Sequence, residues 1–241
     1  MKRYFFLLAL VSLGSVSLFA AEPRMPKDAP NHLEHAGQRH SAKKKKSRRD
    51  ALPSTDAFLS AEGHFKAFDE ACAASDDKTA MLHAGVIESN FRNHSSFKKH
   101  RFDAAVAYYK ADHLVEANRA LTDYLVAGIP EHFQEALSYK FEIAQKFSKN
   151  KSGKYPMVKK IFTERSFPER AIEIYNDIVL FAPASDIAAY ALFHKGQVEM
   201  SVADYDDSID TFRRLIHDFI GHDLLPQAYY GVAQSYFGKY A

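Results

Sequence analysis

The chain has 241 residues, a formal net charge of +2 and 46% hydrophobic residues, which is enough apolar material for one sizeable domain or an array of small ones. With 10 glycines, 9 prolines and a single cysteine, the chain is neither fibrous nor disulfide-rich, and no intramolecular disulfide can form. Folding must therefore rest on packing alone.

The N-terminal stretch MKRYFFLLALVSLGSVSLFAAEP has the order of a secretory signal peptide. Lys2 and Arg3 precede an apolar run, and Ala20 and Ala21 provide small residues before the polar sequence begins. The run is short for a membrane span, although an uncleaved membrane anchor is the alternative. No cysteine lies near the exit for lipid attachment. We expect residues 1–20 to be a signal peptide and the mature chain to be exported.

Residues 21–53 predict a disordered basic linker. The segment contains four prolines and few apolar residues, and residues 21–50 carry nine Lys and Arg against four Asp and Glu. Such a composition buries too little surface to offset its ordering entropy. Its basic block has two open interpretations, a solvated spacer or a contact with an anionic surface such as lipid headgroups, and the export signal argues against a nucleic-acid role. The candidate contact residues are Lys43, Lys44, Lys45, Lys46, Arg48 and Arg49.

Residues 54–241 are predicted to be all-α, with about ten helices, because no alternating strand pattern occurs in them. Phe65, Phe68 and Cys72 fall on one helical stripe, so we interpret Cys72 as a small core residue. Asp76 is a suitable N-terminal cap for the helix that follows. The stretch SKNKSGKYPM, 148–157, predicts a surface loop between helices.

The segment AIEIYNDIVLFAP, 171–183, places a small, an aromatic and a bulky residue on one helical face before a proline. The small residue lets a second helix approach closely. The pattern returns in ANRALTDYLVAGIP, 117–130, with Leu121 and Tyr124 as its large residues, and in SIDTFRRLIHDFI, 208–220, where Ile220 replaces the proline. AAYALFHKGQVEMSVADY, 188–205, supplies a matching first helix. Helix pairs of about 34 residues are typical of tetratricopeptide repeats. Residues 54–241 are therefore predicted to form a tetratricopeptide-like helical-hairpin solenoid.

In such an array the first helix of each pair lines a concave groove, which the second, fifth, ninth and twelfth residues of that helix face. Aromatic side chains mixed with amides suit the binding of an extended or helical peptide. On the last helix the exposed aromatic residues would form an apolar contact patch, unless half of them pack on the preceding repeat. The predicted groove residues are Phe133, Lys140, Tyr190, Phe193, Gln197, Met200, Tyr229 and Tyr236, together with Ala136 and Val232.

The export signal followed by repeats ending in DLLPQAYYGVAQSYF resembles the BamD-like family of outer-membrane assembly factors. The motif DIAAYALFHKGQVEM followed by ADYDDSIDTFRRLIHDF is also similar to periplasmic tetratricopeptide coordinators of cell division and peptidoglycan synthesis. Either resemblance implies a non-catalytic scaffold in the periplasm or at the periplasmic face of the outer membrane, whose partners are other envelope proteins or peptides. The lipidated cysteine of the BamD-like family is missing.

Enzymatic motifs are missing from the sequence. It has no phosphate-binding glycine loop, no HExxH and no GxSxG, so we expect no cofactor and no catalysis. His217 and His222 are five residues apart and would not share a helix face. An exported zinc-dependent enzyme that uses the chain's histidines, including the tail residues His32, His35 and His40, is the alternative from a different functional class.

Overall fold

The computed structural model describes residues 59–129, 131–149 and 166–241. The predicted signal peptide, the basic linker and most of the predicted loop at 148–157 lie outside these residues. The described residues form nine helices and no strand, which confirms the all-α prediction. The helices are α1 (Ala61–Ala73), α2 (Asp77–Asn90), α3 (Phe97–Lys110), α4 (Leu114–Val126), α5 (Phe133–Lys149), α6 (Phe167–Phe181), α7 (Asp186–Ser201), α8 (Tyr205–Asp218) and α9 (Leu225–Tyr240).

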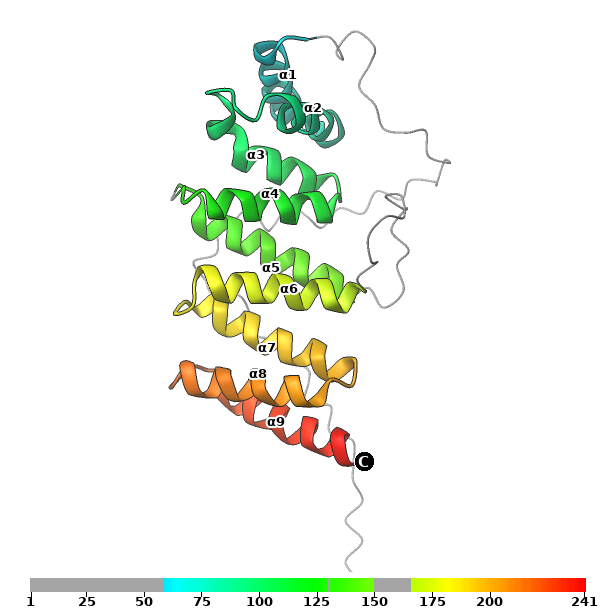
Figure 1. Cartoon of the computed structure of the whole chain (residues 1–241), viewed down its shortest axis with the longest axis vertical. Coiled ribbons are helices and arrows are strands. Elements are labelled where there is room, and N and C mark those ends of the chain that lie inside the picture. The colour runs from blue at the N-terminus through cyan, green and yellow to red at the C-terminus, as the bar shows by residue number, and fades with distance from the viewer. Residues whose placement is uncertain (1–58, 130, 150–165) are drawn as a thin grey trace, which may run out of the picture.

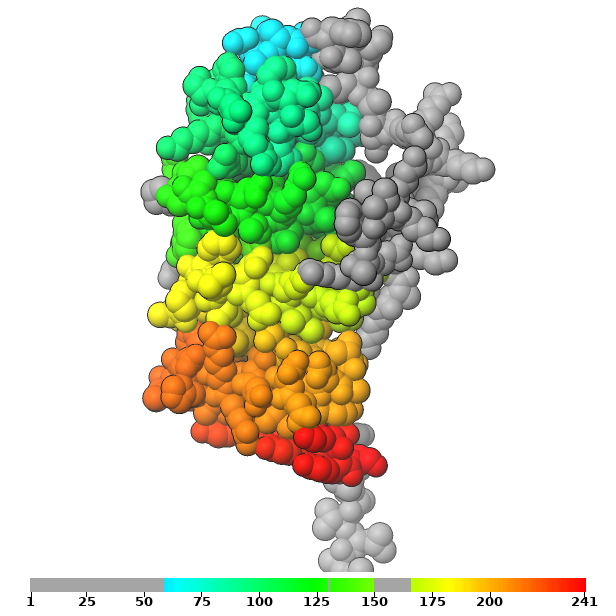
Figure 2. All heavy atoms as spheres, viewed as in Figure 1, coloured from blue at the N-terminus to red at the C-terminus, as the bar shows by residue number. Residues whose placement is uncertain are grey.

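The helices stack one after another along the long axis, with α1 at one end and α9 at the other (Figure 1). Consecutive helices pack against each other, and α3 also contacts α5, α5 contacts α7 and α7 contacts α9. Side chains fill the spaces between successive layers, so the described residues make a continuous column (Figure 2). The fold is a solenoid of the hairpins α1–α2, α3–α4, α5–α6 and α7–α8, with α9 packed on the last.

Three hairpins are closed by the same turn. In each, one residue after the first helix adopts a left-handed conformation, with φ between 56° and 64°. The backbone N–H of the next residue then donates to a carbonyl five residues back, at 2.9 Å in all three turns. This is the hydrogen-bond pattern of a Schellman ending, which satisfies the last carbonyls of a helix. The left-handed residues are Ser75, Asp112 and Ala203.

Polar side chains set where two of the helices begin. The Asp76 side chain accepts a hydrogen bond from the Thr79 backbone N–H at 3.2 Å, which confirms its predicted role as a cap. At the start of α6, the Ser166 hydroxyl accepts from the Glu169 N–H, and the Glu169 carboxylate accepts from the Ser166 N–H at 2.8 Å. This capping box fixes the point at which the chain re-enters the stack.

The small, aromatic and bulky residues of the repeat pattern form the centre of the core. Every one of them is at most 2% exposed, because each lies where its helix crosses a neighbour. The prediction of a repeated packing unit is therefore confirmed at all three copies. These residues are Ala117, Leu121 and Tyr124 on α4, Ala171, Tyr175 and Ile178 on α6, and Ser208, Phe212 and Leu215 on α8.

The Phe212 ring lies between two glycines of neighbouring helices. A Cβ atom added to Gly196 of α7 would approach the ring to 2.8 Å, and one added to Gly231 of α9 would approach it to 2.5 Å. Both distances are below normal carbon contacts. The ring therefore occupies space that only glycine leaves open on either side, and it joins α7, α8 and α9.

The prediction that Cys72 is a core residue was wrong. Cys72 is exposed on α1, whereas its neighbour Ala71 is buried together with Phe65 and Phe68. The helical stripe was assigned one residue too far along the chain. Ala71 is the residue that faces the adjoining helix, and a methyl group suffices there.

A charged group is buried between α7 and α8. Glu199 is only 2% exposed, and its Oε1 lies 3.3 Å from the Lys195 Nζ, which also donates to the Thr211 hydroxyl at 3.2 Å. Burial raises the pKa of the Glu199 carboxyl above its usual 4.5, and the Thr211 hydroxyl and the Lys195 ammonium oppose this rise. The ionised carboxylate is thus less stable in the folded chain than in the unfolded chain.

Replacing Glu199 by Gln should remove a contribution to stability that becomes unfavourable as the pH rises. A carboxyl with a raised folded pKa lowers stability above about pH 4.5, and this loss disappears as the pH falls through the folded pKa. The free energy of unfolding of the Glu199→Gln variant, relative to the parent, should therefore rise between about pH 4.5 and pH 7.5. Urea unfolding followed by circular dichroism across this range tests it. A difference that does not change with pH would contradict the buried-carboxylate account.

Candidate partner-binding surfaces

The described residues contain no group of three or more His, Cys, Asp and Glu arranged to hold a metal ion. His217 lies with its Nδ1 2.7 Å from the Asp218 Oδ1, and its side chain is largely exposed. The tail histidines lie outside the described part of the chain. A search of the described helices for one long and apolar enough to cross a membrane finds none.

Among the described residues, several exposed apolar side chains gather on α9, opposite the side that packs on α8. Its buried side consists of Ala228, Gly231 and Ser235. The only charged residue in the helix is Lys239, whose ammonium pairs with Asp206 of α8. Five large aromatic residues remain accessible, and we call them the aromatic face of α9. They are Tyr229 (61% exposed), Tyr230 (51%), Tyr236 (36%), Phe237 (78%) and Tyr240 (77%).

These aromatic residues keep a large part of their side chains accessible. Of the two sequence-based expectations, packing of half of them on the preceding repeat was wrong, because all are at least 36% exposed. Tyr236 is held in place by α8, since its hydroxyl accepts a hydrogen bond from the Arg213 Nη2 at 2.7 Å. The predicted groove residues Tyr229 and Tyr236 both belong to this face.

The α7 residues predicted to line the groove divide into two groups. Tyr190, Gln197 and Met200 are half-buried and keep part of their side chains accessible, and the Tyr190 ring lies 5.6 Å from the His222 ring. Phe193 was wrongly assigned to the groove. It is 4% exposed, and its ring packs 5.9 Å from the Phe212 ring inside the α7–α8 hairpin.

On α5, Phe133 is half-buried and lines a hollow of about 520 Å³ at the α4–α5 turn. Lys140 was wrongly assigned to the groove, because its side chain is completely buried. Its Nζ donates to the Thr122 hydroxyl at 2.6 Å, to the Asn118 Oδ1 at 2.7 Å and to the Asp177 Oδ2 at 2.9 Å. All three ammonium protons are therefore satisfied inside the protein.

The Lys140 cluster, which consists of Lys140, Asn118, Thr122 and Asp177, connects three helices. Asn118 and Thr122 come from α4, Lys140 from α5 and Asp177 from α6. Burial lowers the pKa of the Lys140 ammonium, and the Asp177 carboxylate opposes that effect. The cluster therefore holds the three helices together, and the Lys140 ammonium has no hydrogen bond left to offer a binding partner.

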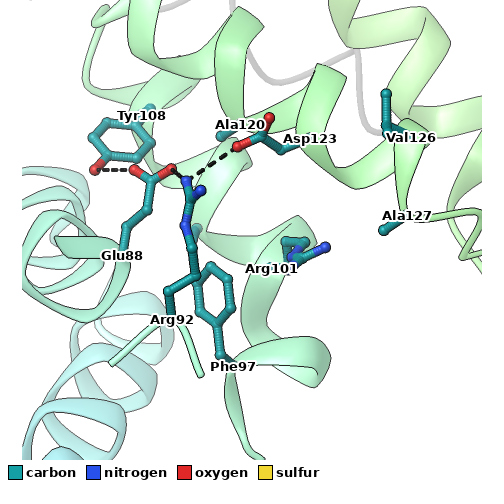
Figure 3. Close-up of a pocket in the computed structure, with 10 residues that line it drawn as sticks. Glu88, Arg92, Phe97, Arg101, Tyr108, Ala120, Asp123, Val126 and Ala127 are labelled. Atoms are coloured by element: carbon teal, nitrogen blue, oxygen red, sulfur yellow. Dashed lines mark hydrogen bonds and ion pairs between the residues drawn. The ribbon is translucent and has the colours of Figure 1, made fainter. Parts of the chain in front are cut away.

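A pocket of about 250 Å³ lies between α2, α3 and α4 (Figure 3). Glu88 on its wall accepts hydrogen bonds from Arg92 at 3.1 Å, from Arg119 at 2.8 Å and from the Tyr108 hydroxyl at 3.2 Å. Arg92 also donates to Asp123 of α4 at 3.1 Å. Sequence reasoning missed this pocket. The available signal was a series of charged residues at half-buried helix positions, which periodicity in apolar residues does not detect.

Searches with family models and among curated proteins find no match to this chain. Among solved structures, the chain is similar to the crystal structure of MamA protein, with 15% sequence identity, a TM-score of 0.42, and 74% of this chain and 82% of that one covered. It is also similar to nearly identical TPR-like repeats of a putative kinesin light chain from Podosopora anserina, with 11% identity, a TM-score of 0.40, and 74% and 84% covered. Similarities of this size identify no partner, so the function has to be argued from the chain's own surfaces.

Proposed function

We propose that this protein is a non-catalytic scaffold of the bacterial envelope that binds a polypeptide partner on the aromatic face of α9. The observation that carries this proposal is the set of five exposed aromatic residues on a helix whose single charged residue is already paired. Exposed apolar patches of this kind on soluble domains mark contact sites, and tyrosine and phenylalanine are frequent interface anchors.

The envelope setting is supported by the N-terminal sequence. The order of basic residues, apolar run and small residues in the first 21 positions is that of an export signal. The sequence resemblance of the C-terminal repeats favours a role in outer-membrane protein assembly or envelope maintenance. Coordination of cell division or peptidoglycan synthesis is the alternative within the same binding class, and contact of the basic linker with anionic lipid is a further part of the proposal.

Site-specific photo-crosslinking in the native cells tests both parts. A photoreactive phenylalanine analogue is placed at Phe237 or Tyr229, and as a matched control at Leu180 of α6, which is 76% exposed. We expect an envelope protein, specifically an outer-membrane assembly component, to crosslink at positions 229 and 237 but not at 180. A cell-division or peptidoglycan-synthesis protein there would favour the alternative role.

The two parts can fail separately in that experiment. Crosslinks to cytoplasmic or ribosomal proteins at position 237 would contradict the envelope setting but not the binding surface. Equal crosslinking at positions 180 and 237 would instead contradict the aromatic face of α9 as the binding surface.

A further inference from the structure

Arg101 on α3 is a cation without an anionic partner among the described residues. Its guanidinium carbon lies 5.0 Å from the centre of the Phe97 ring, and its Nε is buried without a hydrogen-bond acceptor. Burying an N–H group without an acceptor costs free energy. The side chain lies on the wall of the pocket between α2, α3 and α4 (Figure 3).

The acidic residues of the same pocket are already engaged. Glu88 accepts from Arg92, Arg119 and the Tyr108 hydroxyl, and Asp123 accepts from Arg92. These contacts hold Glu88 and Asp123 on other side chains, and no described residue accepts a hydrogen bond from the Arg101 Nε. An acceptor for this N–H would therefore come from outside the described residues.

The next hairpin shows what occupies the corresponding position there. Lys140 of α5 follows Arg101 by thirty-nine residues, and the buried pairs Phe102–Phe141 and Ala105–Ala144 keep the same spacing. Likewise, Asp177 of α6 follows Asp123 of α4 by the fifty-four residues that separate Ala117 from Ala171. In the α4–α5–α6 unit the Lys140 ammonium is fully buried and lies 2.9 Å from the Asp177 carboxylate.

In the α2–α3–α4 unit the equivalent carboxylate, Asp123, pairs with Arg92 instead. Among the described residues no anion pairs with Arg101, and a pocket of about 250 Å³ lies beside it. The pocket wall also includes Phe97, Ala104 and Ala127, which are apolar. Polar and apolar walls together suit a carboxylate carried on an apolar stem.

We propose that this pocket binds a carboxylate group of a polypeptide, either an acidic side chain or a free C-terminus, with Arg101 donating to it. A guanidinium recognises a carboxylate through parallel N–H donors, and such charge-assisted bonds are the stronger class of hydrogen bond. The nature of the ligand, a polypeptide, rests on the proposed scaffold function. The site itself is independent of the aromatic face of α9, because it lies on different helices.

The test follows the Nε–Hε resonance of Arg101 by NMR in the ¹⁵N-labelled full chain, assigned by its loss in Arg101→Gln. The probes are the capped tripeptide acetyl-Leu-Glu-Leu-amide, its Gln counterpart, and acetyl-Leu-Leu with either a free or an amidated C-terminus. We expect a saturable downfield shift with the Glu peptide or with the free C-terminus, and none with their uncharged counterparts. The tighter of the two binders identifies the source of the carboxylate.

Variants provide the second readout. Arg101→Gln should weaken binding of the charged peptide about tenfold or more, whereas Arg214→Gln, which removes an equal charge from the exposed face of α8, should change it less than about twofold. Val126→Asp places a carboxylate on an exposed rim position and should compete with the peptide, which gives a test that does not disturb the buried side chain.

The proposal would be overturned by an unchanged Arg101 resonance at saturating peptide, or by equal binding to the Arg101→Gln and Arg214→Gln variants. Unaltered peptide binding by Val126→Asp would also count against it. None of these results bears on crosslinking at positions 229 and 237, so failure of this site and failure of the proposed scaffold function are distinguishable.

Discussion

Replacing Asp177 by Ala should lower the free energy of unfolding by about 3 kcal/mol. The Lys140 ammonium is completely buried, and the Asp177 carboxylate is its only anionic partner among the described residues. Removing the carboxylate, whose side chain is 36% exposed, leaves an uncompensated ammonium in the interior. The loss should fall at the lower end of the usual range, because Asn118 and Thr122 still accept hydrogen bonds from the ammonium. Urea unfolding followed by circular dichroism measures the change.

Two further results would identify the charge as the cause. The pKa of Lys140 is already lowered by burial, and losing Asp177 lowers it further. The folded variant then sheds this proton at a lower pH than the unfolded chain, so its deficit should shrink as the pH rises from 7 toward 9.5 or so. Adding Lys140→Met, which keeps an unbranched stem without the charge, should recover much of the loss. A deficit no larger than that of Asp210→Ala, an exposed carboxylate on α8, would contradict the account.

Replacing Phe212 by Ala should cost about 3–5 kcal/mol. The ring is 1% exposed and fills the space between Gly196 and Gly231, so its removal leaves a cavity shared by α7, α8 and α9. Phe237→Ala is the matched control, because it deletes the same ring at a site that is 78% exposed. Equal losses for the two variants, measured by urea unfolding, would show that Phe212 does not hold these helices together.

The glycines give the complementary measurement. Gly231→Ala should cost about 1–3 kcal/mol, because its Cβ would lie 2.5 Å from the Phe212 ring. When Phe212 is first changed to Leu, the same substitution should cost much less, since the clash is relieved and alanine favours a helix by up to about 1 kcal/mol over glycine. An identical cost in both backgrounds would rule out the ring as the source of the penalty.

The periodicity of the sequence was sufficient to predict the helix-on-helix packing. Ala171, Tyr175 and Ile178 share one face at any helix crossing, so their burial follows from spacing and size alone. The choice of groove residues failed at Lys140 and Phe193, because position along a helix does not show which neighbouring helix covers it. A lysine is ordinarily exposed, and its burial here depends on acceptors supplied by two other helices.

The pocket beside Arg101 depends on a choice that the sequence does not encode locally. Asp123 of α4 pairs with Arg92, which follows α2, and Arg101 has no carboxylate partner among the described residues. Arg101 and Lys140 occupy equivalent positions in successive hairpins, and only the structure shows that Lys140 has a carboxylate partner and Arg101 has none among the described residues. Repeats that share a backbone can therefore differ in chemistry through a single change of partner.

The three left-handed turn residues, Ser75, Asp112 and Ala203, bear on how durable this chain is. Each carries a Cβ atom in a conformation that glycine adopts without steric penalty, and the penalty for other residues is about 1–2 kcal/mol at each position. With residues that suit these turns, the same fold could thus withstand a higher temperature or denaturant concentration. The natural sequence is therefore less stable than this fold allows, as expected of a protein selected for sufficient rather than maximal stability.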